Sequence, residues 1–156
     1  MNAHELMTKH VVTCRIDENL AVAAQRMWEH DCGVIPIVTH EGALVGILTD
    51  RDICMATLFS GRPANAIGIA EAMSKQVAFV RPGQGVEAVS RLMADMKVRR
   101  IPVVDTGETL LGIISITDIA REAAKPGAKV ERNNVRAIDT LAAICQPRGG
   151  PAARAL

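Results

Sequence analysis

The sequence predicts an α/β fold made of two packed copies of one β-α-β-β-α unit, followed by a helical extension. The main observation is a repeat without gaps, in which Met7 and Leu44 and their neighbours recur 66 residues later at Met73 and Leu110. The second observation is composition, since 49% of the residues are hydrophobic. A unit of about fifty residues buries too little apolar surface alone, so the two copies are expected to pack together.

The first copy predicts a strand, a helix, two strands and a second helix, in that order. A short apolar run predicts an entering strand over residues 11–14, and Asp17 is the expected N-cap of the next helix. The residues of that helix expected on its inner face are Leu20, Ala23, Ala24, Met27 and Trp28. Compact apolar runs predict strands over 34–38 and 44–48, and a second helix is expected to open at Thr49.

The second copy predicts the same order of elements. Its first helix is expected to turn Val86, Val89, Leu92, Met93 and Met96 inward. Strands are expected over 101–104 and 110–115, followed by a helix over 116–124. We therefore place one unit at residues 1–59, a linker at 60–68 with a short helical turn after it, and the second unit at 69–124.

Residues 125–156 form the predicted C-terminal extension. An apolar stripe of Val135, Ile138, Leu141, Ala142 and Cys145 predicts a helix at about 132–146, ahead of a disordered end. This helix is expected to pack on the body of the protein or across a dimer. From Lys125 onward the extension has six basic and two acidic residues, so a tail that binds an acidic partner is the alternative.

Composition argues against several classes of function. Eighteen basic and seventeen acidic residues leave a net charge of +1, which gives no electrostatic reason to expect a nucleic acid or a membrane as partner. Cys14, Cys32, Cys54 and Cys145 are scattered, so neither a metal site nor a disulfide framework is expected. With no signal-peptide pattern and no apolar run near the roughly twenty residues that span a bilayer, we expect a cytoplasmic protein.

Two strand-to-helix junctions carry the predicted chemistry. In both copies a glycine-containing strand leads into a hydroxyl residue, Thr49 or Ser115, and a carboxylate follows three residues later, at Asp52 or Asp118. A helix N-terminus attracts phosphate, and a carboxylate one turn along can accept hydrogen bonds from both ribose hydroxyls. The duplicated pattern therefore favours a nucleotide site in the cleft between the two copies.

The same pattern has a purely structural interpretation. Ser/Thr-x-x-Asp resembles a capping box, in which hydroxyl and carboxylate bond only the helix backbone. The sequence offers no nucleophile paired with a base, so no catalytic residue is expected and the chain is not predicted to be an enzyme.

The repeat, the Ile-Pro strands at Ile35 and Ile101, and the two junctions together resemble a tandem pair of CBS (cystathionine-β-synthase) domains, over about residues 3–124. The resemblance implies a free-standing Bateman module, which binds AMP, ADP, ATP or an S-adenosylmethionine-like ligand as a regulator and requires no cofactor. It further implies energy sensing, signal transduction and a homodimer that acts on an unidentified target protein.

The resemblance also implies roles for individual residues. Thr49 and Ser115 match the hydroxyl that contacts phosphate, and Asp52 and Asp118 match the carboxylate that binds ribose. The positions that usually surround the adenine are Thr13, Phe79, Ile35, Pro36, Ile101 and Pro102. The basic position near phosphate is Arg100, with Arg99 beside it, and Arg51 of the first copy is a further predicted ligand-binding residue. Because Gly33 and Val34 replace the two arginines in the first copy, the two clefts are expected to differ.

Two other functions remain open from the sequence. The chain could be a dimerisation scaffold whose clefts are vestigial, with both Ser/Thr-x-x-Asp motifs serving only as caps. It could also be a nucleic-acid-binding adaptor that uses the basic extension, whose binding would fall steeply with salt.

Overall fold

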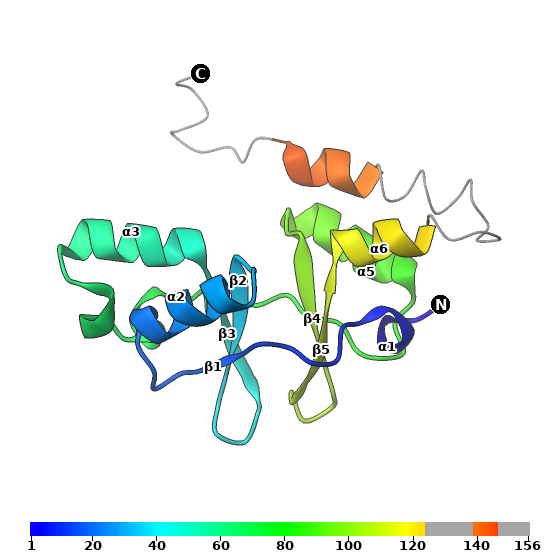
Figure 1. Cartoon of the computed structure of the whole chain (residues 1–156). Coiled ribbons are helices and arrows are strands. Elements are labelled where there is room, and N and C mark those ends of the chain that lie inside the picture. Colours follow the sequence, from blue (N-terminus) through cyan, green and yellow to red (C-terminus); the bar gives the residue numbers. More distant parts are fainter. Residues whose placement is uncertain (124–138, 147–156) are drawn as a thin grey trace. The chain divides into compact units, whose positions relative to one another are not determined.

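The computed structural model describes residues 1–123 and 139–146. These residues divide into two compact units, whose elements are labelled in Figure 1. The first body consists of Thr8–Phe79 and Val104–Gly112, and the second body consists of Met1–Met7, Val80–Val103 and the described residues from Ile113 onward. No helix within the described ranges is long and apolar enough to cross a membrane.

A three-stranded sheet organises the first body. Its strands are β1 (Cys14–Arg15), β2 (Val34–Val38) and β3 (Leu44–Thr49), in the order β1-β2-β3. The β1 strand runs parallel to β2, with Cys14 opposite Ile37, whereas β2 and β3 are antiparallel. The predicted entering strand thus begins later than expected, at Cys14 instead of residue 11.

Two longer helices and two short ones complete the first body. They are α2 (Leu20–Glu29), α3 (Asp50–Ser60), the 3-10 turn η1 (Ala64–Ala66) and α4 (Ile69–Ala72). Side chains with no exposed surface, including Leu20, Ile35, Ile37 and Leu48, form an aliphatic core between these elements. The near absence of aromatic residues is therefore compatible with a well-filled interior.

The α2 helix corrects two expectations. Its N-cap is Asn19, whose side chain accepts hydrogen bonds from the amides of Ala21 and Val22, and not Asp17. Asp17 instead pairs with Arg15, at 3.2 Å. Trp28, which was expected on the inner face, is 88% exposed. Met27, one residue earlier, occupies the buried position at the end of the helix.

The segment predicted as a linker packs against the first body. Gly61 ends α3 in the left-handed conformation with a φ of 64°, a conformation that glycine adopts without steric cost. Ile67 and Ile69 are buried, and Gly68 forms a β-bridge with Asn19. Residues 64–72 therefore contribute core side chains to the first body.

The second body repeats this architecture with a smaller sheet. Its elements are α1 (Ala3–Leu6), α5 (Val86–Met96), β4 (Arg100–Val104) as far as Val103, β5 (Leu110–Ser115) from Ile113 onward, and α6 (Ile116–Ala123). The β4 and β5 strands form a two-stranded sheet, and a parallel bridge between Val80 and Val103 reproduces the pairing of Cys14 with Ile37. Val89 and Met93 of α5 are buried as expected, but Met96 is 49% exposed.

The two bodies exchange segments in a symmetric way. Asn2, at the start of α1, forms a β-bridge with Gly85 at the start of α5. Asn2 corresponds to Gly68 in the 66-residue repeat, and Gly85 corresponds to Asn19, so this bridge is the counterpart of the bridge between Gly68 and Asn19. The β4–β5 turn joins the first body, where the Leu44 amide donates to the Glu108 carbonyl at 2.9 Å. Each body thus contains residues from both sequence copies.

The described part of the extension is helical over residues 139–145. Its buried side chains are Thr140 and Ile144, whereas Leu141 is 45% exposed and Cys145 is exposed. The face that packs is therefore not the predicted stripe. The rest of the predicted helix, residues 132–138, and the predicted disordered end lie outside the described residues.

Candidate functional site

The first predicted junction is a hydrogen-bonded cap at the start of α3. The Thr49 hydroxyl donates to Asp52 Oδ2 at 2.7 Å and accepts from the Asp52 amide at 3.1 Å. The Thr49 amide donates to the same carboxylate oxygen at 2.9 Å. The capping box expected as the structural interpretation is therefore present, and it uses one of the two oxygens of Asp52.

The second junction has the same geometry at the start of α6. The Ser115 hydroxyl and amide donate to Asp118 Oδ2 at 2.6 and 2.8 Å. Two further contacts distinguish it from the first junction. The Ser115 and Thr117 hydroxyl oxygens are 2.6 Å apart, and Arg121 lies 3.6 Å from Asp118 Oδ1. The second carboxylate thus has a basic neighbour on its other oxygen.

The second carboxylate oxygen of Asp52, Oδ1, decides whether the residue could bind a ligand in addition to capping α3. Among the described residues, Asp52 Oδ1 makes no hydrogen bond or ion pair, and the residue is half-buried. A carboxylate can cap a helix through one oxygen and accept further hydrogen bonds through the other. The two roles of the motif are therefore compatible at the first junction.

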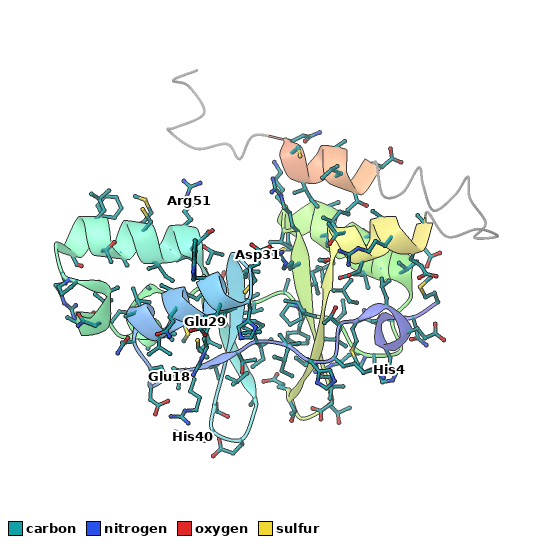
Figure 2. All side chains as sticks on the ribbon, in the orientation of Figure 1. His4, Glu18, Glu29, Asp31, His40 and Arg51 are labelled. Carbon is teal, nitrogen blue, oxygen red and sulfur yellow. The ribbon has the colours of Figure 1, made fainter. Side chains whose placement is uncertain are left out.

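The predicted basic residues lie on the surface. Arg99, Arg100 and Arg51 are all exposed, and Figure 2 shows Arg51 pointing away from α3. The carbonyl of Arg99 accepts the amide of Ile116 at 2.9 Å, so Arg99 is held next to the first residue of α6.

In the first body, Gly33 stands at the position of that arginine. The Gly33 carbonyl accepts the amide of Asp50 at 3.1 Å, which is the counterpart of the bond between Arg99 and Ile116. A Cβ atom at Gly33 would lie 2.9 Å from Asp50 Oδ2. The first junction thus has the Asp50 carboxylate beside position 33, where the second junction has Arg99, and the two junctions differ in charge.

The predicted adenine-surrounding residues are mostly buried. Ile35 and Ile101 have no exposed surface, and Pro36 and Pro102 are buried in β2 and β4. Thr13, which precedes β1, is half-buried, as is Phe79. The pairing of Cys14 with Ile37 places the backbone of Thr13 near that of Pro36. The surroundings of an adenine base stay a prediction.

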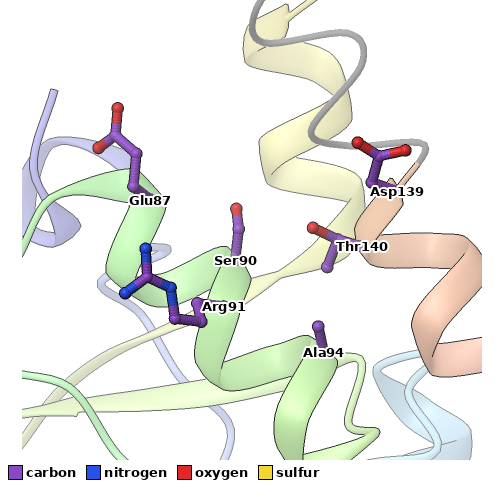
Figure 3. Close-up of a pocket in the computed structure, with 6 residues that line it drawn as sticks. All are labelled: Glu87, Ser90, Arg91, Ala94, Asp139 and Thr140. Atoms are coloured by element: carbon purple, nitrogen blue, oxygen red, sulfur yellow. The ribbon is translucent and has the colours of Figure 1, made fainter.

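A pocket that the sequence did not predict lies between α5 and the C-terminal helix. It has a volume of about 280 Å³ and is lined by Glu87, Ser90, Arg91, Ala94, Asp139 and Thr140. Figure 3 shows Ser90 and Thr140 on the two sides of this pocket. None of the predicted ligand-binding residues lines this pocket. The sequence did not predict the pocket because it depends on where the C-terminal helix packs against α5.

The cap at Thr49 has a measurable effect on stability. We expect Thr49→Ala to lower the free energy of unfolding by about 1 kcal/mol, because the Asp52 amide loses its acceptor. Urea unfolding followed by circular dichroism measures this change. Ser60→Ala, which removes an exposed hydroxyl from the end of the same helix, is the control and should stay within about 0.5 kcal/mol of the wild type. Equal free energies for the two variants would show that the cap contributes nothing.

No group of three or more His, Cys, Asp or Glu residues that could hold a metal ion occurs in residues 1–123 and 139–146.

Comparison with known proteins identifies the family of this chain. The family model for the CBS domain matches residues 3–58 and 69–125. The CBS domain-containing protein YhcV of Bacillus subtilis is 37% identical over 116 residues, which are 74% of this chain and 81% of YhcV.

Two solved structures share the fold. Hypoxic Response Protein I, crystallised with two coordinated zinc ions, has 33% identity and a TM-score of 0.72 over 81% of this chain and all of that chain. The sequence of Hypoxic response protein 1 from Mycobacterium tuberculosis is 31% identical over 93% of this chain. The CBS domain pair of protein MJ0100, in complex with 5′-methylthioadenosine and S-adenosyl-L-methionine, has 28% identity and a TM-score of 0.68 over 78% of this chain and 94% of that chain.

These matches confirm the predicted α/β fold of two CBS units, with the C-terminal helix as a minor addition. Both the family model and the relatives span the repeat that the sequence shows. This chain belongs to the CBS domain family and contains two CBS domains in tandem.

Proposed function

We propose that this protein is a regulatory module that binds an adenosine-containing ligand between its two CBS domains and signals through a change in conformation or assembly. The observation that carries the proposal is the duplicated junction, in which Asp52 caps α3 through Oδ2 alone. Its other oxygen can accept hydrogen bonds from ribose hydroxyls. The adenosyl ligands of the MJ0100 pair, which is 28% identical, support this class of ligand.

The proposed ligand carries phosphate or another negatively charged group, because the residues around the proposed site are basic. Arg51 and Arg99 stand beside the starts of α3 and α6, where the helix dipole adds positive potential. Arg100, next to Arg99, is the third exposed cation of the proposed site. AMP, ADP and ATP are therefore tested alongside S-adenosylmethionine.

The first-body carboxylate is proposed as the stronger ribose acceptor. Asp118 already has Arg121 near its second oxygen, at 3.6 Å, whereas Asp52 has no such neighbour within the described residues. Binding to Asp118 must displace or share that arginine. A module with one strong and one weak adenosyl site follows from this difference.

Exposed apolar side chains support a proposed assembly of two copies. Trp28 on α2 is 88% exposed, and Leu58 and Phe59 at the end of α3 are 67% and 81% exposed. Large apolar side chains on helix surfaces are typical of protein interfaces. The exposed apolar side chains of α2 and of the end of α3 are therefore proposed to pack on a second copy of the chain.

Calorimetric titration with AMP, ATP, S-adenosylmethionine and 5′-methylthioadenosine tests the proposal. The wild type should bind at least one of these ligands, and Asp52→Asn should weaken that binding about 10- to 100-fold, as expected for a lost hydrogen bond to a charged group. Asp118→Asn should have a smaller effect. Sedimentation velocity on the same samples measures the change in assembly.

Asp50→Asn is the matched control for this experiment. Asp50 lies in the same helical turn and is exposed, and its Oδ1 accepts the amide of Arg51 at 2.7 Å. The Asp50→Asn variant should bind like the wild type. If none of the four ligands binds the wild type, or if Asp52→Asn and Asp118→Asn both bind as Asp50→Asn does, the scaffold function replaces this proposal.

A further inference from the structure

An ion pair fixes the chain just before β1 in the first body. Arg26 of α2 donates through Nη1 and Nη2 to the two carboxylate oxygens of Glu18, at 2.7 and 2.8 Å. The Glu18 side chain, labelled in Figure 2, is 17% exposed and that of Arg26 is 34% exposed. A two-pronged pair of this kind holds both side chains in one geometry.

The same two side chains hold the backbone on both sides of Cys14. Arg26 Nη1 also donates to the Thr13 carbonyl at 2.9 Å, and Glu18 Oε2 accepts the Arg15 amide at 2.7 Å. Cys14 between them is 1% exposed and pairs with β2. Residues 13–15 are therefore fixed by the sheet on one side and by the ion pair on the other.

The second sequence copy keeps only half of this arrangement. The residue equivalent to Glu18 is Gln84, whose Oε1 accepts the Arg81 amide at 2.6 Å. The residue equivalent to Arg26 is Leu92, which has no group that could donate a hydrogen bond. The backbone contact is thus repeated, and the guanidinium that bonds the preceding carbonyl is specific to the first copy.

We infer that Arg26 is a positioning residue that fixes the backbone of Thr13 for selective recognition of the purine base. The inference rests on the proposed function and on the position beside the adenine base that the family resemblance implies for Thr13. A backbone donor or acceptor that is fixed before binding pairs with one base and is left unpaired by a base with a different hydrogen-bonding edge. Because the backbone is already ordered, binding loses no conformational entropy there. The first copy thus supplies the selective half of the base site.

Electrostatics keeps the ion pair intact at neutral pH. Hydrogen bonding from Arg26 lowers the pKa of the Glu18 carboxyl, and the same contact raises the pKa of Arg26. Both side chains are therefore charged under ordinary conditions, which maintains the two-pronged geometry.

Two pairs of probes that differ at position 6 of the purine test the inference: AMP with IMP, and 5′-methylthioadenosine with 5′-methylthioinosine. The wild type should prefer the adenine member of a pair. Arg26→Leu, which copies the residue of the second repeat, should reduce that preference about tenfold, because the Thr13 carbonyl is no longer fixed. Arg26→Lys retains a donor and Glu18→Gln retains an acceptor, so each should reduce the preference for adenine less than Arg26→Leu does. These two variants provide the test if Arg26→Leu does not fold.

Arg62→Leu is the matched control. Arg62 pairs with Glu71 at 2.8 Å and also donates to the carbonyl of Ala66, so its contacts have the same chemistry within the same body. This variant should retain the full preference for adenine whatever its stability. An unchanged preference in all three Glu18 and Arg26 variants, or equal binding of both members of each pair by the wild type, would overturn the inference. A wild type that binds none of the probes would overturn the proposed function as well.

Discussion

Replacing Ile35 by alanine should lower the free energy of unfolding by about 2–5 kcal/mol, the range found when a large core side chain is truncated. Ile35 lies in the middle of the sheet of the first body, has no exposed surface and belongs to the core cluster that includes Leu20 and Leu48. The cavity left by three missing carbon atoms cannot be filled from solvent. Urea unfolding followed by circular dichroism measures the loss.

Ile35→Val provides the graded control for that prediction. It removes one methylene from the same site, so the loss should be about 0.5–1.5 kcal/mol. If Ile35→Ala and Ile35→Val are equally stable, Ile35 does not pack as the structure places it. Should Ile35 instead lie mainly against a ligand, both variants would lose adenosyl binding while keeping the stability of the wild type.

Gly46→Ala should also destabilise the protein, by about 1–3 kcal/mol, because the new methyl group overfills a closed site. A Cβ atom at Gly46 would lie 2.5 Å from Met73 Sδ and 3.2 Å from the Ser74 carbonyl oxygen. Met73 is itself only 8% exposed, and the Ser74 backbone is fixed by its bridge to Ile47. Neither group can move aside without disturbing the core of the first body.

Two further variants make the Gly46 prediction specific. Gly83→Ala adds the same methyl group at a position with no atom within 4 Å and should change stability by less than about 0.5 kcal/mol. Combining Gly46→Ala with Met73→Ala removes the clash, so the loss in the double variant should be smaller than the sum of the two single losses. Strict additivity would contradict the close contact between Gly46 and Met73.

The sequence predicted those parts of the fold that depend on local pattern. The 66-residue repeat predicted equivalent strands and helices, and the structure has β2, β3, β4 and β5 within one or two residues of the expected positions. The caps at Thr49 and Ser115 were predicted because a hydroxyl and a carboxylate three residues apart suit a helix start. These features require no knowledge of distant contacts.

Features that depend on competition between neighbouring groups were predicted less well. Asp17 and Asn19 are both good N-caps, and the outcome reflects the contacts of Asp17 with Arg15 and with His40, at 3.2 and 3.4 Å. Trp28 fits the helical period, but Met27 fills the buried position. Spacing alone does not decide between adjacent candidates.

The role of Arg26 shows why part of the candidate site was missed. An arginine on a helix is usually solvated, so nothing in the local pattern indicated the bonds to Glu18 and to the Thr13 carbonyl. The available signal was the alignment of the two copies, in which Leu92 stands at the equivalent position. The ligand-binding roles of the residues named from the sequence stay predictions that rest on the family resemblance.

The exchange of segments between the bodies constrains the order of events during synthesis on the ribosome. Residues 1–7 belong to the second body, where Ala3 bonds the backbone of Gln84, so they are made before their partners and cannot dock until some eighty later residues have emerged. Residues 8–79, in contrast, meet most of their partners soon after translation, and chains generally fold from the N-terminus as they emerge. A nascent chain of this protein therefore carries residues 1–7 undocked while its first body forms, and a partner fused directly before residue 1 would be attached to the last part to fold.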